Sequence, residues 1–357
     1  MVVDKNFVLQ EIEPGDIDIN GRCIVPYGVV AIKDHAFAYK TNLCSVVLPN
    51  TVQKIESSAF EQCVNLKSIN LPNSLKAIEI YAFADCHKLE DVKIPDGVSE
   101  IQPGTFIDCH SFRSIFLPDS VVCIAEYAFC HCEQLKEIRL PQHLDYIGES
   151  AFACCYELEK ITIPHGIINV PDNIFYDCRK LSDVIISDDV CEIGTDAFWH
   201  CTSLKEIHLP DSIEEIGSYA FKECSSLEKI NLPTQLSTLS AGVFMNTSLS
   251  NIELPNGLTD IGTRAFFGTK ITEVNIPSSV NLVEKGAFAN NVLENVTIYQ
   301  NTKYRSNSFK GSDNPCNINV INNPISKSSV YDEIVSGNCI RNNSIDANAA
   351  LDEDIER

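Results

Sequence analysis

The chain has 357 residues, 44% of them hydrophobic, and a formal net charge of −22 at pH 7. A surface this acidic repels phosphate backbones, so nucleic-acid binding is disfavoured. No stretch approaches the roughly 20 consecutive apolar residues of a membrane-spanning helix, so membrane insertion is not expected. The apolar content is sufficient for a continuous core.

Residues 1–21 are mixed and acidic. Asp4, Lys5, Glu11 and Glu13 interrupt any apolar run, so this segment does not have the pattern of a secretory signal peptide. The compartment therefore stays open: the chain is either cytoplasmic or exported by a signal outside this sequence. We expect residues 1–21 to cap the repeat that follows, because the end of an array must cover its apolar core.

From residue 22 to about 310 the chain is built from one recurring motif. Residues 66–86 show it in full as Leu-x-x-Ile-x-Leu-Pro, Leu-x-x-Ile and Ala-Phe-x-x-Cys, and it returns every 23 residues, later every 22. Thirteen phenylalanines keep the period: Phe37, Phe60, Phe83, Phe106, Phe129, Phe152, Phe175, Phe198, Phe221, Phe244, Phe266, Phe288 and Phe309. A fixed period in the twenties predicts a single solenoid rather than two globular domains.

Each unit predicts a short strand followed by a short helix. In the unit quoted above, Leu66, Ile69 and Leu71 should point inward, with the strand over residues 68–71, because neighbouring strand residues face opposite sides. Pro72 has no N–H to donate and ends the ladder. The Ala-Phe-x-x-Cys segment, residues 82–86, is predicted to be a helix, because its phenylalanine and cysteine are three apart and share a face.

Sixteen cysteines raise the question of disulfides and metals. Eight of them occupy one slot of the repeat: Cys63, Cys86, Cys109, Cys132, Cys155, Cys178, Cys201 and Cys224. That regularity favours reduced core thiols, since free cysteine packs as a small hydrophobe. The Cys130-His131-Cys132 run suggests zinc, but core thiols beside surface histidines are the better interpretation, because zinc needs about four converging ligands. We expect no metal site.

The repeat resembles the BspA-like, or type 5, leucine-rich repeat. Residues 206–227, E-I-H-L-P-D-S-I-E-E-I-G-S-Y-A-F-K-E-C-S-S-L, match its consensus almost position for position. The resemblance implies an α/β solenoid: a right-handed leucine-rich-repeat superhelix with a parallel β-sheet on the concave face and short helices on the convex face. It also implies adhesion or host interaction at a microbial surface, and hence a cell-surface or secreted location.

The strand positions that should point outward on the concave sheet differ from unit to unit. Variation within a rigid frame is typical of a recognition surface, and aromatic and arginine side chains dominate interface energetics. The predicted partner-binding residues are Phe116, Arg139, Thr162, Ile185 and His208, with Glu137, Lys160 and Asp183 in the neighbouring row. The alternative is a solvated sheet face without a partner.

Tyr176 and Trp199 take the same slot in successive units, just after the phenylalanine. They suggest an aromatic patch on the convex side; the alternative is partial burial under the neighbouring coil. No phosphate loop, nucleophile elbow or HExxH motif is present, so no catalytic residue or cofactor is assigned.

After Phe309 the repeat dissolves. Residues 311–340 are expected to form a C-terminal cap, with a strand over 316–321 and a helical turn over 330–335, and residues 341–357 an acidic, disordered tail. The sequence thus predicts a monomeric, non-enzymatic protein-binding or glycan-binding module of the microbial surface. An intracellular scaffold of the same fold is the alternative, and an enzyme a remote one.

Overall fold

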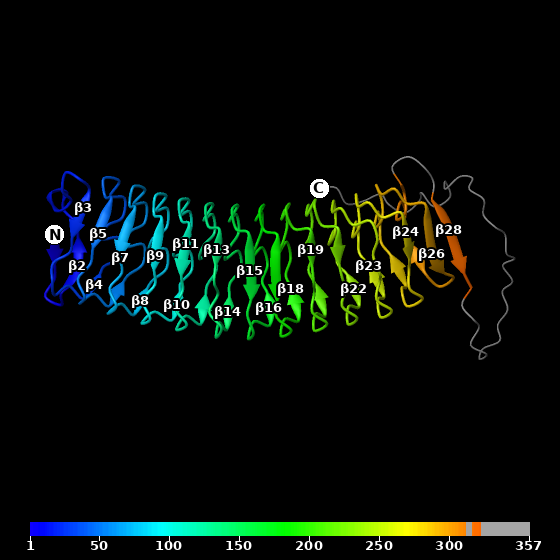
Figure 1. Ribbon diagram of the computed structural model, residues 1–357, viewed down its shortest axis with the longest axis horizontal. Helices are drawn as coiled ribbons and strands as arrows, with labels where there is room; N and C mark the ends of the chain where they lie inside the picture. The colour runs from blue at the N-terminus through cyan, green and yellow to red at the C-terminus, as the bar shows by residue number, and fades with distance from the viewer. Residues whose placement is uncertain (312–315, 323–357) are drawn as a thin grey trace, which may run out of the picture.

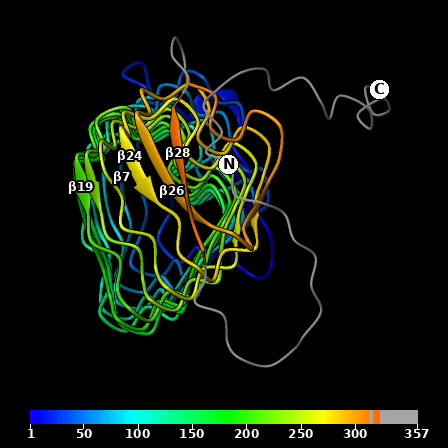
Figure 2. The same ribbon diagram turned by 90° about the vertical axis from the view of Figure 1, so that its right-hand side faces the viewer.

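The computed structural model describes residues 1–311 and 316–322. Its coils stack in a single elongated row that runs from the blue N-terminal end to β28 at the orange end (Figure 1). Seen from one end, the green coils of the middle lie to one side of the blue and orange coils, so the row is curved (Figure 2). The predicted solenoid is confirmed. The expected helical turn at 330–335 and the expected tail at 341–357 lie outside the described residues.

One side of the solenoid is a ladder of parallel strands, the first ladder. Its strands bury alternate residues; in β7, for example, Ile69 is buried between exposed Ser68 and Asn70. The strands are β3 (Arg22–Ile24), β5 (Ser45–Val47), β7 (Ser68–Asn70), β9 (Asp91–Lys93), β11 (Ser114–Phe116), β13 (Glu137–Ile138), β15 (Lys160–Ile163), β17 (Asp183–Ile186), β19 (Glu206–Ile207), β21 (Lys229–Ile230), β24 (Glu273–Asn275), β26 (Asn295–Tyr299) and β28 (Asn317–Ile321). This is the predicted sheet.

A second parallel ladder, which the sequence did not predict, covers another side of the coils. Most of its strands coincide with the second half of the Leu-x-x-Ile motif, whose isoleucine is buried while the residue before it faces outward; Ala31–Ile32, with both residues buried, and Lys303–Tyr304, with both exposed, are exceptions. They are β2 (Val8–Glu11), β4 (Ala31–Ile32), β6 (Lys54–Ile55), β8 (Ala77–Ile78), β10 (Glu100–Ile101), β12 (Cys123–Ile124), β14 (Tyr146–Ile147), β16 (Asn169–Val170), β18 (Glu192–Ile193), β20 (Glu215–Ile216), β22 (Thr238–Leu239), β23 (Asp260–Ile261), β25 (Leu282–Val283) and β27 (Lys303–Tyr304).

The third side consists of consecutive turns, so the predicted convex helices are wrong. Within one coil the Ala59 N–H donates to the Glu56 carbonyl, but the Phe60 N–H donates to Ala82 of the next coil, at 2.8 Å. Ser58 takes a left-handed φ of 53°, which a right-handed helix cannot contain. Alternating bonds within and between coils thus replace the i to i−4 pattern. Among the described residues, the only helix is the 3-10 turn η1 (Pro14–Asp16).

The core is organised around the phenylalanine column. Consecutive rings lie with centroids 4.6 to 6.0 Å apart, stacked except for the tilted pair Phe175–Phe198, and the inner ones are fully buried. Each cysteine of the repeat slot points its thiol at the phenylalanine carbonyl of the preceding coil, as Cys201 does to Phe175 at 3.3 Å. The thiols therefore join neighbouring coils inside the core, in agreement with the predicted packing role.

The N-terminal segment ends the ladders. β1 (Val2–Val3) runs antiparallel to β2, the first rung of the second ladder. An antiparallel bridge from Ile17 to Cys23 lies against the first rung of the other ladder.

No helix in the described part of the chain is long and apolar enough to cross a membrane.

Candidate functional site

The outward side of the first ladder, here called the strand face, carries all eight side chains predicted to contact a partner. Each is exposed and alternates with a buried or half-buried residue of the same strand or coil: Phe116, Glu137, Arg139, Lys160, Thr162, Asp183, Ile185 and His208. Phe116 and Ile185 each expose 56% of their surface. Covering a large apolar side chain this open would remove apolar area from water, and the backbone of the sheet is already ordered, so only side-chain freedom is lost.

Strand register brings several of these side chains together. Glu137 pairs with Lys160, which pairs with Asp183 on the next rung, so the three charges alternate in sign. The Lys160 ammonium lies 3.3 Å from the Glu137 carboxylate, and both are well exposed. Thr162 is level with Ile185. Because exposed ion pairs contribute only about 0–1 kcal/mol, a partner can exchange these pairs for its own charges at small cost.

His208 lies apart from the others, at a groove of about 490 Å³ between β19, β21 and residues 251–253. The groove forms where the first ladder is interrupted: within the described chain, residues 251–254 make no hydrogen bond through their backbone. The side chain of Asn231 folds back to bond both the N–H and the carbonyl of Leu209, at 2.8 and 2.7 Å. This groove was not predicted from the sequence, although the repeat period changes from 23 to 22 residues at this place.

Tyr176 and Trp199 lie on the turn face, the side formed by the consecutive turns. Their rings stack on each other with centroids 4.4 Å apart, and both are half-buried. The Lys222 ammonium lies 5.8 Å from the centre of the Trp199 ring. Neighbouring coils therefore occupy much of the ring surface that a stacking ligand would use.

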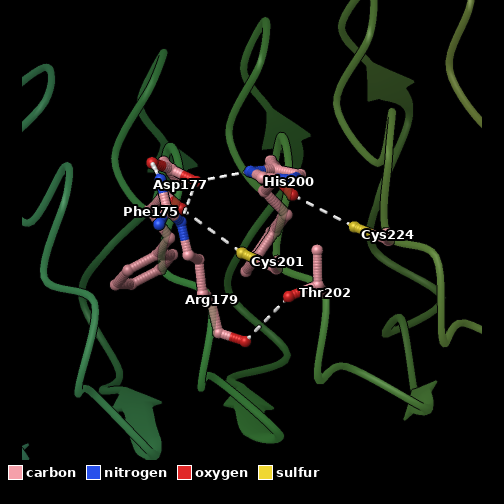
Figure 3. A network of polar contacts seen from close by, with 8 residues as sticks. Phe175, Asp177, Arg179, His200, Cys201, Thr202 and Cys224 are labelled. Carbon is pink, nitrogen blue, oxygen red and sulfur yellow. Dashed lines mark hydrogen bonds and ion pairs between the residues drawn. The ribbon is translucent and has the colours of Figure 1, made fainter.

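Beside this pair, Asp177 bonds side chains from its own and the next coil (Figure 3). Its carboxylate accepts hydrogen bonds from Arg179 at 3.0 and 2.7 Å and lies 2.5 Å from Nδ1 of His200. Burial opposes ionisation of Asp177, but the bonds from Arg179 and His200 outweigh it and hold the pKa of Asp177 below its ordinary value. The cluster of Asp177, Arg179 and His200 links adjacent coils through side-chain hydrogen bonds. It was not predicted from the sequence, although Asp177 and His200 are separated by one repeat period of 23 residues.

The buried cysteines of the repeat slot do not have the surroundings of a metal or nucleophile site. Burial raises the pKa of Cys63 to about 12 and that of Cys132 well above its ordinary value, so the reactive thiolate is disfavoured. His131, between two buried cysteines, instead lies 3.1 Å from Asp108. In residues 1–311 and 316–322 no three potential ligands gather around a common point, and all fifteen cysteines are free.

Known proteins show the same architecture. A leucine-rich repeat protein of Bacteroides ovatus is 23% identical, with a TM-score of 0.51 over 88% of this chain and 94% of that one. A leucine rich cell surface protein of Faecalibacterium prausnitzii is 26% identical, with a TM-score of 0.51 over 82% of each chain. The pneumococcal vaccine antigen PcpA is 21% identical, with a TM-score of 0.57 over 85% and 82%. No curated protein is significantly similar to the chain.

The repeat itself matches a family description, "BspA type Leucine rich repeat region (6 copies)", over residues 22–121, 99–227 and 191–318. These overlapping matches span the thirteen-phenylalanine array. The chain belongs to the BspA-type leucine-rich repeat family.

Proposed function

We propose that the protein is a non-enzymatic interaction module that binds a protein partner through its strand face. The observation that carries this proposal is the contrast between the two rows of the first ladder. The inward row is uniformly apolar and mostly buried, with Val184 and Ile230 half-buried, whereas the outward row presents Phe116, Arg139, Ile185 and other exposed side chains that change from rung to rung. Stability does not require those identities, so recognition is the better account of them.

The proposed contact centre is the segment from β11 to β17. It combines two exposed apolar groups, Phe116 and Ile185, with the guanidinium of Arg139 and the alternating charges of Glu137, Lys160 and Asp183. Interfaces typically join a few aromatic or arginine anchors to a polar rim. The half-buried Tyr176–Trp199 pair is a secondary candidate on the turn face.

We further propose that this binding takes place at a microbial cell surface, as adhesion to a host or neighbouring cell. The support is the likeness to the Faecalibacterium prausnitzii protein, described as a leucine rich cell surface protein, at 26% identity over 82% of this chain. Cell fractionation with an antibody, combined with protease treatment of intact cells, tests the location. Recovery of all the protein from the cytosol would leave the intracellular scaffold as the function.

Pull-down from host-cell or partner-cell extracts tests the strand face. We expect the Phe116→Ala/Arg139→Ala variant to lose the partners that the native chain recovers. The matched control, Tyr39→Ala/Lys88→Ala, also removes one exposed aromatic and one exposed cation, but from outside the first ladder. Equal recovery by all three proteins would remove the strand face as the binding site. Glycan arrays probed with the same proteins test the glycan alternative.

A further inference from the structure

The outward face of the second ladder is acidic along the middle of the solenoid. Between β10 and β20, the exposed and half-exposed positions of the strands and the residues beside them include no lysine or arginine. They include eight carboxylates: Glu100, Glu126, Asp145, Glu149, Asp172, Glu192, Glu214 and Glu215. We call this surface the acidic face.

None of these eight carboxylates forms an ion pair with any residue in the described part of the chain. The strand face of the same coils differs, because it mixes Lys93, Arg139 and Lys160 with acidic residues and pairs Lys160 with Glu137. The net charge is thus unevenly distributed, and the acidic face keeps an uncompensated negative potential that attracts cations.

This face also has a hollow at its centre, whose lining combines apolar and acidic side chains. A depression of about 410 Å³ lies between β14, β16 and β18. Tyr146 and Ile168, which line it, expose 46% and 54% of their surfaces. The Tyr146 hydroxyl donates a hydrogen bond of 2.7 Å to Glu126, which restrains the ring. Asp145 and Glu149 lie at the same depression, and Glu149 accepts a hydrogen bond from the Asn173 amide. Exposed apolar surface and carboxylates without a basic partner therefore adjoin.

We propose that the acidic face binds an extended segment of a partner protein that carries both basic and apolar side chains. An apolar side chain of the segment covers Tyr146 and Ile168, and lysine or arginine side chains meet the carboxylates around them. The charge excludes anionic partners such as nucleic acids and acidic lipid surfaces. A cationic small molecule would leave the length of the face, from β10 to β20, uncovered. This surface is separate from the strand face, and the proposal does not depend on that one.

The test uses the full chain and a short fluorescein-labelled peptide of alternating lysine and leucine, followed by fluorescence anisotropy. We expect saturable binding that weakens at least about tenfold when the ionic strength rises from about 0.05 to about 0.5 M, because salt screens exposed charges. The same peptide with glutamate for lysine should not bind. With serine for leucine it should bind more weakly.

Variants locate the site. Asp145→Asn/Glu149→Gln should weaken the lysine–leucine peptide about three- to tenfold, since each exposed pair contributes roughly 0.2–1 kcal/mol. The matched control, Glu137→Gln/Asp183→Asn, removes the same charge from the strand face and should change the affinity less than about twofold. Ile168→Ser should weaken the lysine–leucine peptide but leave the lysine–serine peptide unaffected.

Three results would overturn the proposal: no binding of the lysine–leucine peptide, equal losses in the two charge variants, or no effect of Ile168→Ser. Equal losses would mean that the peptide responds only to the total charge of −22. The Phe116→Ala/Arg139→Ala variant should bind the peptide normally, so failure here and failure of the strand-face proposal are distinguishable.

Discussion

Replacing Phe129 by alanine tests whether the phenylalanine column supports the solenoid. The ring is fully buried and stacks between Phe106 and Phe152, with centroids 5.6 and 5.5 Å away. Deleting a buried phenylalanine side chain costs about 3–5 kcal/mol through lost transfer energy and the cavity left behind. Phe129 should fall in the upper part of that range, because two aromatic contacts, each worth about 0.5–1.5 kcal/mol, vanish together.

The matched control is Phe116→Ala, the same substitution at a ring that is 56% exposed. It should cost less than about 1 kcal/mol, since little apolar surface returns to water. Urea unfolding followed by far-UV circular dichroism gives the free energy of each variant, and hydrogen exchange shows whether loss of Phe129 opens only the neighbouring coils. Similar destabilisation by both substitutions would refute the assignment of one ring to the core and the other to the surface.

Three further predictions concern Asp177, the thiols and one glycine. Because the pKa of Asp177 is lowered in the folded chain, its stabilising contribution is present above the unfolded value of about 3.9 and is lost as the pH falls through the folded pKa. The difference in unfolding free energy between the native chain and Asp177→Asn, measured by urea unfolding at several pH values, should therefore shrink below about pH 4. A difference that stays constant with pH would contradict a stabilising role for the ionised Asp177 carboxylate. Maleimide labelling with peptide mapping at about pH 8 should modify Cys44 and Cys191, which are half-exposed, well before the buried repeat-slot cysteines; rapid native labelling of Cys132 would be inconsistent with this core. Gly104 has a φ of +59°, and a Cβ there would lie 2.2 Å from the Tyr81 ring, so Gly104→Ala should destabilise the chain by about 1–3 kcal/mol. That loss should be smaller in a Tyr81→Ala background; strict additivity in calorimetry would argue against the contact.

Much of the architecture was predictable because each slot of the repeat is sampled many times. The inward positions, represented by Leu66 and Ile69, are buried as predicted, and the outward row containing Phe116 and Ile185 is exposed. A single copy would not have separated these rows, but consistent apolar identity against variable identity does so.

The error over the helices has a specific physical origin. The three-residue spacing of phenylalanine and cysteine in Ala-Phe-x-x-Cys fits one face of a helix, yet a series of turns places the same residues inward. The decisive difference is the left-handed backbone at positions such as Ser58 and Tyr81. Neither residue type signals that conformation, which is uncommon outside glycine, asparagine and aspartate.

The second ladder was missed because its strands are mostly two residues long, as in β8 (Ala77–Ile78), too short to show alternation. Without that ladder the acidic face could not be recognised, since its carboxylates are scattered along the sequence and gather only when the coils stack. The groove at His208 depends on the backbone of residues 251–254 failing to pair. Only the shortened period hinted at that failure.

The bonds that join the coils have a consequence for how the length of this protein can change. The backbone bond from Phe60 to Ala82 and the thiol bond from Cys201 to Phe175 connect equivalent slots, and the same pair of slots recurs in unit after unit. Removing or duplicating one whole 23-residue unit inside the uniform stretch would rejoin chemically identical partners. Unequal recombination in the gene could thus lengthen or shorten the rod without rebuilding its interior, and would at the same time move one set of surface side chains relative to another.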